Sequence, residues 1–193
     1  MIDHQHLPDW RMSRTMQWCC SPGQIDGPLV DGLARCWLEV ANAGGAVGFP
    51  FPPVTSAQVS AATKRLVASL EPRGTRLFIA CERTAIIGWP ALEQNHSPLT
   101  CHWARIFRVQ TALSVRGSGV GRALLAEAAR AAREDLHLDQ LHLELRSGEG
   151  LEGFSAACGW EEVGRWPAAL RFGPGDDRDE VLMVLRLAPA TGP

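Results

Sequence analysis

The sequence predicts an α/β fold in which one mixed β-sheet carries helices on both faces. The chain has 193 residues, 46% of them hydrophobic and 21% charged, which suits one globular domain with a sizeable core. Apolar residues recur at helical spacing in some segments and alternate in others, so helices and strands follow one another along the chain. Elements in this order bury their apolar faces in packed layers.

The first part of the domain combines a strand with two helices. A strand is expected from Arg14 to Cys20, where turn residues stop it. A helix follows from about Pro28 to Asn42, because proline suits a first helical turn. A second helix opens at Thr55, which has capping-box spacing to Gln58. The loop 48–53 between them contains three prolines and is apolar; it is either a rigid connector or the lip of a pocket.

Three successive strands are predicted next, and their tight connections make them an antiparallel meander. They run from Arg76 to Cys81, from Thr84 to Gln94, and from Cys101 to Val109, the last continuing toward Val115. The clearest helix of the chain follows over 119–134, because alanine is abundant there and the apolar side chains share one face.

The last part of the domain alternates strictly over Leu141–Arg146, which predicts a strand. A short helix is expected from about Glu149 to Cys158, and a closing hairpin joins 160–171 to 180–187. The domain therefore extends over 14–187. Residues 1–13 are expected to form a disordered or loosely attached leader and residues 188–193 a tail.

Composition excludes several classes of function. The formal net charge is -2, from 19 basic and 21 acidic side chains, which argues against a nucleic-acid-coating surface. No stretch approaches the ~18 consecutive apolar residues of a membrane span, and residues 1–10 are not expected to form a signal peptide, because they lack a basic segment followed by an apolar run. The six cysteines show no C-x-x-C spacing or clustering with histidine. We therefore expect reduced thiols, no metal site, no membrane partner and a cytoplasmic location.

The segment Val115–Arg122 lies between a strand and the alanine-rich helix, and it points to an anionic ligand. Its glycines let backbone N–H groups turn toward an anion, and the helix dipole favours negative charge there. A dinucleotide fingerprint would need glycine where Arg122 stands, and a Walker loop would need lysine, but the chain's one lysine is Lys64. A phosphate or pyrophosphate ligand is the simplest prediction; a turn without any ligand is the alternative.

Arg116-Gly117-Ser118-Gly119-Val120-Gly121 resembles the R/Q-x-x-G-x-G/A signature of the GNAT superfamily of acyl-CoA-dependent N-acetyltransferases. The segment 143–146 followed by 153–164 is similar to that family's second half, which includes a Gly-aromatic step. Residues 46–49 followed by Pro52-Pro53 resemble a bacterial branch with tabtoxin-resistance-type acetyltransferases. The resemblance covers about 14–187. It implies a mostly antiparallel sheet of six or seven strands with about four helices.

The resemblance also implies acetyl-CoA as the acyl donor. The loop 116–122 would hold its pyrophosphate, and the pantetheine arm would pair with the backbone of the preceding strand, where that strand separates from the next. A backbone N–H near Thr111 would polarise the acetyl carbonyl. The implied cofactor-binding residues are Val109, Gln110, Thr111, Arg116, Gly117, Ser118, Gly119, Val120, Gly121 and Arg122.

Two catalytic positions follow from the same resemblance. The amine must lose a proton before it attacks, and Glu144 is the expected base because related enzymes place a carboxylate on this strand. Glu93 and His142 are alternatives, and Glu144 is otherwise an exposed polar residue. The thiolate of CoA usually receives a proton from a family tyrosine, but this chain has no tyrosine and Ser155 stands at that position. A serine hydroxyl is the poorer acid.

The function expected from the sequence is transfer of an acetyl group to a primary amine of a small molecule, by direct attack in a ternary complex. The acceptor pocket is expected to involve Phe49, Phe51, Trp89, Glu93 and Trp166. The alternative is a catalytically impaired acyl-CoA-binding sensor or interaction module, which the serine at 155 motivates. The expected partner is a small-molecule amine, with no nucleic acid, and the chain is expected to be a monomer or homodimer.

Overall fold

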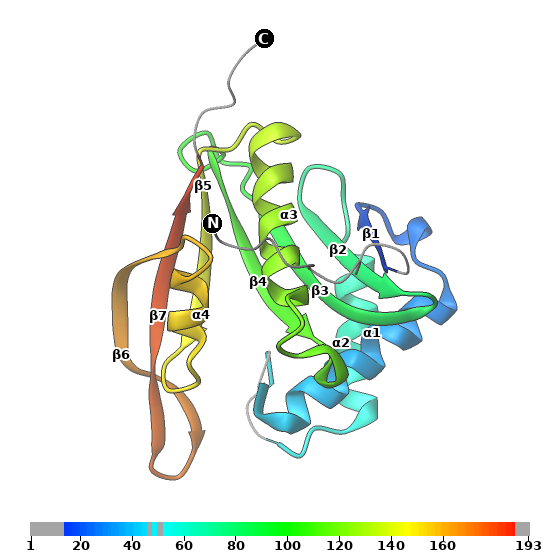
Figure 1. Ribbon diagram of the computed structural model, residues 1–193, viewed down its shortest axis with the longest axis horizontal. Coiled ribbons are helices and arrows are strands. Elements are labelled where there is room, and N and C mark those ends of the chain that lie inside the picture. The colour runs from blue at the N-terminus through cyan, green and yellow to red at the C-terminus, as the bar shows by residue number, and fades with distance from the viewer. Residues whose placement is uncertain (1–13, 46–47, 50–51, 188–193) are drawn as a thin grey trace, which may run out of the picture.

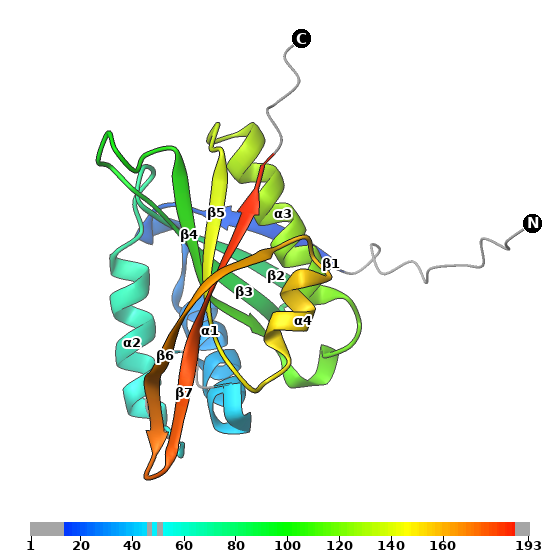
Figure 2. The same ribbon diagram turned by 90° about the vertical axis from the view of Figure 1, so that its left-hand side faces the viewer.

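The sheet contains seven strands in the order β1-β2-β3-β4-β5-β7-β6. The computed structural model describes residues 14–45, 48–49 and 52–187. Helices α1 and α2 cover one face of the sheet, and α3 and α4 cover the other (Figures 1 and 2). This arrangement confirms the predicted fold class. The expected leader 1–13 and tail 188–193 lie outside the described residues.

The elements follow the predicted order along the chain. The helices are α1 (Gly27–Val40), α2 (Ser56–Ala68), α3 (Val120–Glu134) and α4 (Leu151–Ala156). The strands are β1 (Arg14–Cys19), β2 (Thr75–Glu82), β3 (Ala85–Gln94), β4 (Trp103–Thr111), β5 (Gln140–Arg146), β6 (Glu161–Gly173) and β7 (Asp176–Arg186). β4 ends at Thr111 instead of continuing toward Val115, because the chain turns there into a 3-10 helix, Leu113–Val115.

Local capping explains where α1 and α2 begin. The carboxylate of Asp26 accepts a hydrogen bond from the N–H of Leu29 at the start of α1. The capping box predicted for α2 is present, since Gln58 N–H donates to the Thr55 hydroxyl and the Gln58 side chain accepts from the Thr55 N–H. Each cap satisfies N–H groups that the first helical turn leaves without a partner.

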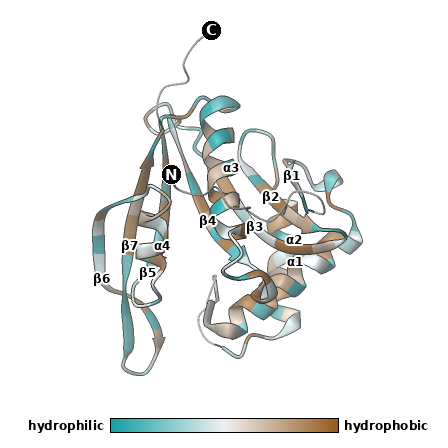
Figure 3. Cartoon of the chain, in the orientation of Figure 1, coloured by the Kyte–Doolittle hydropathy of each residue, from teal (hydrophilic) through white to brown (hydrophobic). Residues whose placement is uncertain are grey.

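The core lies on both faces of the sheet. Trp37 of α1 and Trp89 of β3 are fully buried on one face, and Leu124 and Leu125 of α3 are buried in the layer on the other. Hydrophobic residues accordingly mark the central strands in Figure 3. Among the described helices, none is both long and apolar enough to cross a membrane.

β4 and β5 run parallel but pair only at one end. The paired residues are Trp103–Ile106 of β4 and Gln140–Leu143 of β5, and beyond them the two strands diverge (Figure 1). β4 also carries a bulge, because Trp89 pairs with Gln110 whereas Ala91 pairs with Phe107. This leaves one extra residue in β4, and a bulge of this kind bends its strand.

Candidate active site

A cavity of about 1120 Å³ lies where β4 and β5 separate. The end of α1, the bulged part of β4, the glycine loop, β5, α4 and the final hairpin all contribute to its walls. Its lining includes Phe49, Arg105, Arg108, Arg116, Glu144, Ser155 and Glu180. The predicted loop and the predicted carboxylate strand therefore meet at one cavity.

The glycine loop presents an open helix N-terminus to this cavity. The N–H groups of Val120, Gly121 and Arg122 form the first turn of α3, and none has a backbone acceptor within the described part of the chain. Gly117 and Gly119 have φ of 76° and 85°, which other residues adopt only with strain. Apart from the chain neighbours of each glycine, no described residue has an atom within 4 Å of where a Cβ would stand on Gly117 or Gly119. Unpartnered N–H groups at a helix N-terminus form an anion site.

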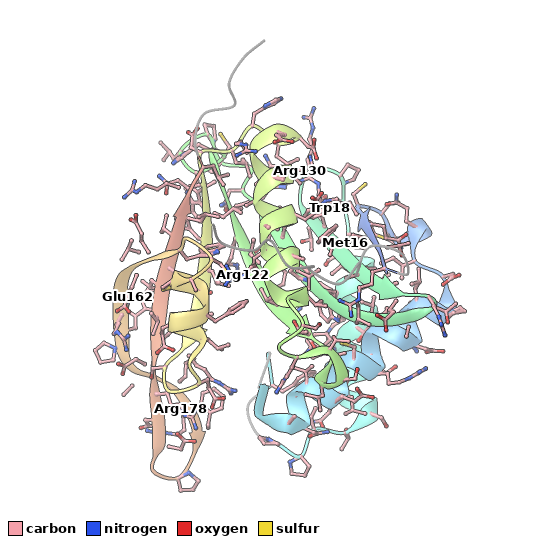
Figure 4. The ribbon with its side chains drawn as sticks, viewed as in Figure 1. Met16, Trp18, Arg122, Arg130, Glu162 and Arg178 are labelled. Atoms are coloured by element: carbon pink, nitrogen blue, oxygen red, sulfur yellow. The ribbon has the colours of Figure 1, made fainter. Side chains whose placement is uncertain are left out.

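The two arginines of the loop have different environments. Arg116 is exposed at the cavity and forms no ion pair with any described residue. Arg122 donates from Nη1 to the carbonyl oxygen of Ala157 at 2.8 Å, and Figure 4 shows it between α3 and α4. Arg116 is therefore available to a phosphate, whereas Arg122 joins the start of α3 to the end of α4.

The loop also packs closely against its neighbours. A Cβ on Gly121 would lie 3.2 Å from the Thr111 hydroxyl oxygen and 3.3 Å from the ring of Phe154. The Ser118 side chain turns back to donate to the carbonyl of Val115 at 2.7 Å and does not line the cavity. Backbone N–H groups, rather than the serine hydroxyl, thus face a ligand.

The strand edge predicted for the pantetheine arm is present. Val109 and Thr111 line the cavity, in the part of β4 beyond its pairing with β5. Gln110 lies between them and is only 1% exposed, on the face covered by α1. Its amide nitrogen and oxygen have no hydrogen-bond partner among the residues described, and neither has Nε1 of the opposing Trp89.

One arginine joins two of the candidate bases. Arg105 Nη2 lies 2.8 Å from Glu93 Oε2, and Arg105 Nη1 lies 3.4 Å from Glu144 Oε2. Glu144 lines the main cavity. Glu93 instead lines a side pocket of about 280 Å³ whose wall also includes Arg65, Arg105 and Arg108.

Glu180 of β7 is a cavity carboxylate that the sequence reasoning missed. It lines the main cavity, and its side chain makes no hydrogen bond or ion pair to a residue in the described ranges. Burial raises the pKa of its carboxyl and nearby Glu144 raises it further, while Arg105 opposes them. The signal was the β5–β7 register: Glu144 pairs with Leu182 and Arg146 with Glu180, which places both glutamates on one face of the sheet.

Ser155 and His142 are the remaining candidates for proton transfer, and the structure places them in different surroundings. Ser155 of α4 lines the cavity, although its exposed fraction is 1%. His142 lies outside the cavity lining and stacks on Trp103, with ring centroids 4.1 Å apart. Its pKa is lowered chiefly by burial, and its Nε2 is 3.2 Å from Oε1 of Gln140. The structure therefore does not bring His142 to the reacting groups.

The expected acceptor residues divide into different environments. Phe49 lines the cavity and packs on Trp37, with centroids 5.1 Å apart, whereas Phe51 lies outside the described residues. Trp89 does not line the cavity as expected, because its pairing with Gln110 directs it into the core, edge-on to Trp37. Trp166 is 54% exposed and is not a lining residue, although it pairs with the lining residue Glu180 from the edge strand β6.

Comparison with known proteins identifies the fold. No family model matches the sequence. The GNAT-family acetyltransferase of Streptococcus pneumoniae superposes with a TM-score of 0.65 at 18% identity, over 90% of this chain and 99% of that chain. YncA of Salmonella typhimurium, solved with its cofactor acetyl-CoA, gives 0.64 at 16% identity, over 94% and 98%. The ribosomal-protein-S18-alanine N-acetyltransferase of Escherichia coli gives 0.64 at 15% identity, over 92% and 96%.

These similarities extend over nearly the whole of each chain. They do not single out the tabtoxin-resistance-type branch. The chain has the fold of the GNAT-family acetyltransferases.

Proposed function

We propose that this chain is an acetyl-CoA-dependent N-acetyltransferase that acetylates a primary amine of a small molecule by direct attack in a ternary complex. One observation carries the proposal: a single cavity contains both an open helix N-terminus beside Arg116 and the carboxylate of Glu180. An anion site for the donor and a base for the acceptor are the two requirements of such a transfer.

The donor would occupy the cavity from the glycine loop to the strand separation. The N–H groups at the start of α3 and the Arg116 guanidinium would hold its phosphates. The backbone edge of Val109–Thr111 would pair with its pantetheine arm. The cofactor in YncA supports acetyl-CoA as the donor, since the two chains share the fold.

The acceptor must lose a proton to become a nucleophile. Glu180 takes that proton in our proposal, because its carboxyl combines a raised pKa with the absence of a described ionic partner. Glu144 is the second candidate, held by Arg105. The neutral amine then attacks the thioester carbonyl, the C–N bond forms and the C–S bond breaks. The nitrogen loses its extra proton as the amide forms, and Ser155 or water relays that proton to the departing thiolate.

Ser155 also motivates the second candidate function, an acyl-CoA-binding sensor or interaction module without turnover. The residue lines the cavity, but its hydroxyl is a weaker acid than a phenol. This candidate keeps the donor site but does not transfer the acetyl group, so the two functions differ only in whether acetyl transfer occurs.

The test combines binding with turnover. Thermal unfolding with and without acetyl-CoA measures donor binding, and we expect a concentration-dependent rise in Tm. Release of CoA thiol with a panel of small primary amines then measures transfer. Donor binding without transfer to any amine favours the sensor, and absence of donor binding contradicts both functions.

A cytoplasmic location belongs to the same proposal. The six cysteines, all unpaired thiols, are consistent with it.

A further inference from the structure

We propose that Arg108 binds a carboxylate of the acceptor, so that the acceptor is a small molecule bearing both an amine and a carboxylate, as an amino acid does. This inference rests on the proposed function and names the class of substrate for the same cavity. It derives from the position of one guanidinium group, its surroundings and its lack of an ionic partner among the described residues.

The bulge in β4 fixes where Arg108 points. The residue has φ of 53°, a conformation in which residues other than glycine are strained. Its guanidinium lies over the Trp37 ring, 4.9 Å from the centroid, and 5.3 Å from the centroid of Phe107. The Nε atom lies 3.2 Å from where a Cβ would stand on Gly48. Aromatic rings and the loop before α2 therefore hold the side chain in place at the cavity wall.

Arg108 has no carboxylate partner within the described residues, although it is partly buried. The undescribed loop residues Ala46, Val47, Pro50 and Phe51 cannot supply one, because none carries an ionisable side chain. Burial lowers the pKa of Arg108, and Arg105 and Arg65 lower it further. Glu93 opposes them, but its carboxylate is 2.8 Å from Arg105. A partly buried charge without a counter-ion is costly, and a bound anion would remove that cost.

The phosphates of the donor are not the anion in question. Arg108 packs over Trp37 of α1, whereas the glycine loop leads into α3 on the opposite face of the sheet (Figure 2). The guanidinium thus lies on the side of the cavity that the donor site leaves to the acceptor. A planar guanidinium matches a carboxylate through two parallel hydrogen bonds.

The same cavity offers a complementary site for the amine. Glu180 lines it without a described ionic partner, while Arg105, which acts on the pKa of both Arg108 and Glu180, has its own charge met by Glu93 and Glu144. With Arg116 and Arg122 at the glycine loop assigned to the donor side, Arg108 and Glu180 are the cation and the anion on the acceptor side that lack a described ionic partner. A zwitterion with a single carboxylate and a single ammonium group balances both.

Binding of product mimics tests the inference independently of turnover. N-acetyl-leucine, N-acetyl-methionine and N-acetyl-phenylalanine, with their carboxamides, are titrated calorimetrically into the CoA-loaded protein. We expect at least one acid to bind about tenfold to a hundredfold more tightly than its carboxamide, as a charge-assisted hydrogen-bond pair provides. Arg108→Gln removes this preference. Arg35→Gln, which changes an exposed arginine of α1, retains it.

Equal binding of every acid and its carboxamide overturns the inference, and so does a preference that persists in Arg108→Gln. Absence of binding by all six compounds also overturns it. The proposed function fails separately: if Arg108-dependent binding of the acids is found but no amine is acetylated, the carboxylate site stands and the transferase activity does not.

Discussion

Glu144 accepts a hydrogen bond from Arg105 across the line where β5 meets β4, with 3.4 Å between Oε2 and Nη1. Arg105 is thus paired with the carboxylate that the sequence predicts to be the base. The side chain of Glu180 accepts no such hydrogen bond from a described residue. Glu180 lies on the neighbouring strand β7 and lines the same cavity. In the proposed mechanism, the proton acceptor Glu180 and the glutamate that helps to raise its pKa, Glu144, are therefore two different residues.

Replacing Glu180 with glutamine is expected to lower kcat about a hundredfold to a thousandfold, because a positioned general base contributes an effect of this size. Glu144→Gln is the matched variant and should lower kcat by less than about tenfold, since Arg105 rather than substrate holds that group. Steady-state kinetics and acetyl-CoA titrations provide the comparison. A larger loss of kcat in Glu144→Gln than in Glu180→Gln would indicate that Glu144 is the base, as the sequence predicts.

The pH profile follows from the raised pKa of Glu180. The base acts only when deprotonated, so kcat/KM should rise with pH across a limb that lies above the ordinary glutamate range, about 4.3. The limb should be missing from the residual activity of Glu180→Gln. A wild-type profile that is flat through this range would contradict the assignment.

Folding stability has the matching sign. The pKa of Glu180 is higher in the folded than in the unfolded state, so the folded protein is more stable when this carboxyl is protonated than when it is ionised. That stability is present at low pH and is lost as the pH rises through the folded-state pKa. Glu180→Gln should therefore raise Tm near neutral pH and leave it unchanged below the ordinary glutamate range. Glu180 is only partly buried, so we expect a small rise.

The two arginines of the glycine loop should respond differently to alanine. Arg116→Ala is expected to weaken acetyl-CoA binding about tenfold through loss of a charge-assisted phosphate contact, with Tm of the ligand-free protein unchanged. Arg122→Ala should lower that Tm, because its hydrogen bond joins α3 to Ala157. Calorimetric titration and thermal unfolding separate the effects. Unchanged donor affinity in Arg116→Ala would contradict the loop assignment.

Ser155→Tyr tests whether the missing phenol limits turnover. Ser155 lines the cavity from α4, so we expect kcat to rise about tenfold or more as a stronger acid meets the thiolate. Ser155→Phe is the control, since it adds the ring without the hydroxyl. Equal kcat in the two variants would show that the phenol donates no proton, and no turnover in either would favour the acyl-CoA-binding sensor.

Gln110 should be replaceable with a gain in stability. Its buried amide has no described hydrogen-bond partner, and each such group costs about 1–3 kcal/mol. Gln110→Met keeps the shape without the polar atoms and should raise the free energy of unfolding by about 1 kcal/mol. Gln140→Met is the control, because Gln140 contacts His142 and its loss should not stabilise. A less stable Gln110→Met would indicate a bound water at the amide.

Local signals were enough to predict the order of elements. Turn residues and capping residues such as Asp26 and Thr55 act within a few positions of the chain, so the sequence carries them directly. The glycine loop was predictable for the same reason, because Gly117 and Gly119 supply their backbone conformations by themselves.

The strand register and the bulges could not be predicted from the sequence. Glu180 reaches the cavity through the pairing of β5 with β7, and Arg108 does so through one extra residue in β4. Trp89 enters the core for a related reason, since its partner across the sheet is Gln110. These positions depend on which residues face each other across strands, and alternation within one strand does not determine that.

Mass spectrometry of a reaction with acetyl-CoA and a mixture of amino acids and simple amines tests the central claim most directly. We expect an N-acetylated amino acid to appear together with an equal amount of CoA, and to form about a hundredfold to a thousandfold more slowly in Glu180→Gln. Protein that binds acetyl-CoA but acetylates none of these amines would contradict the account.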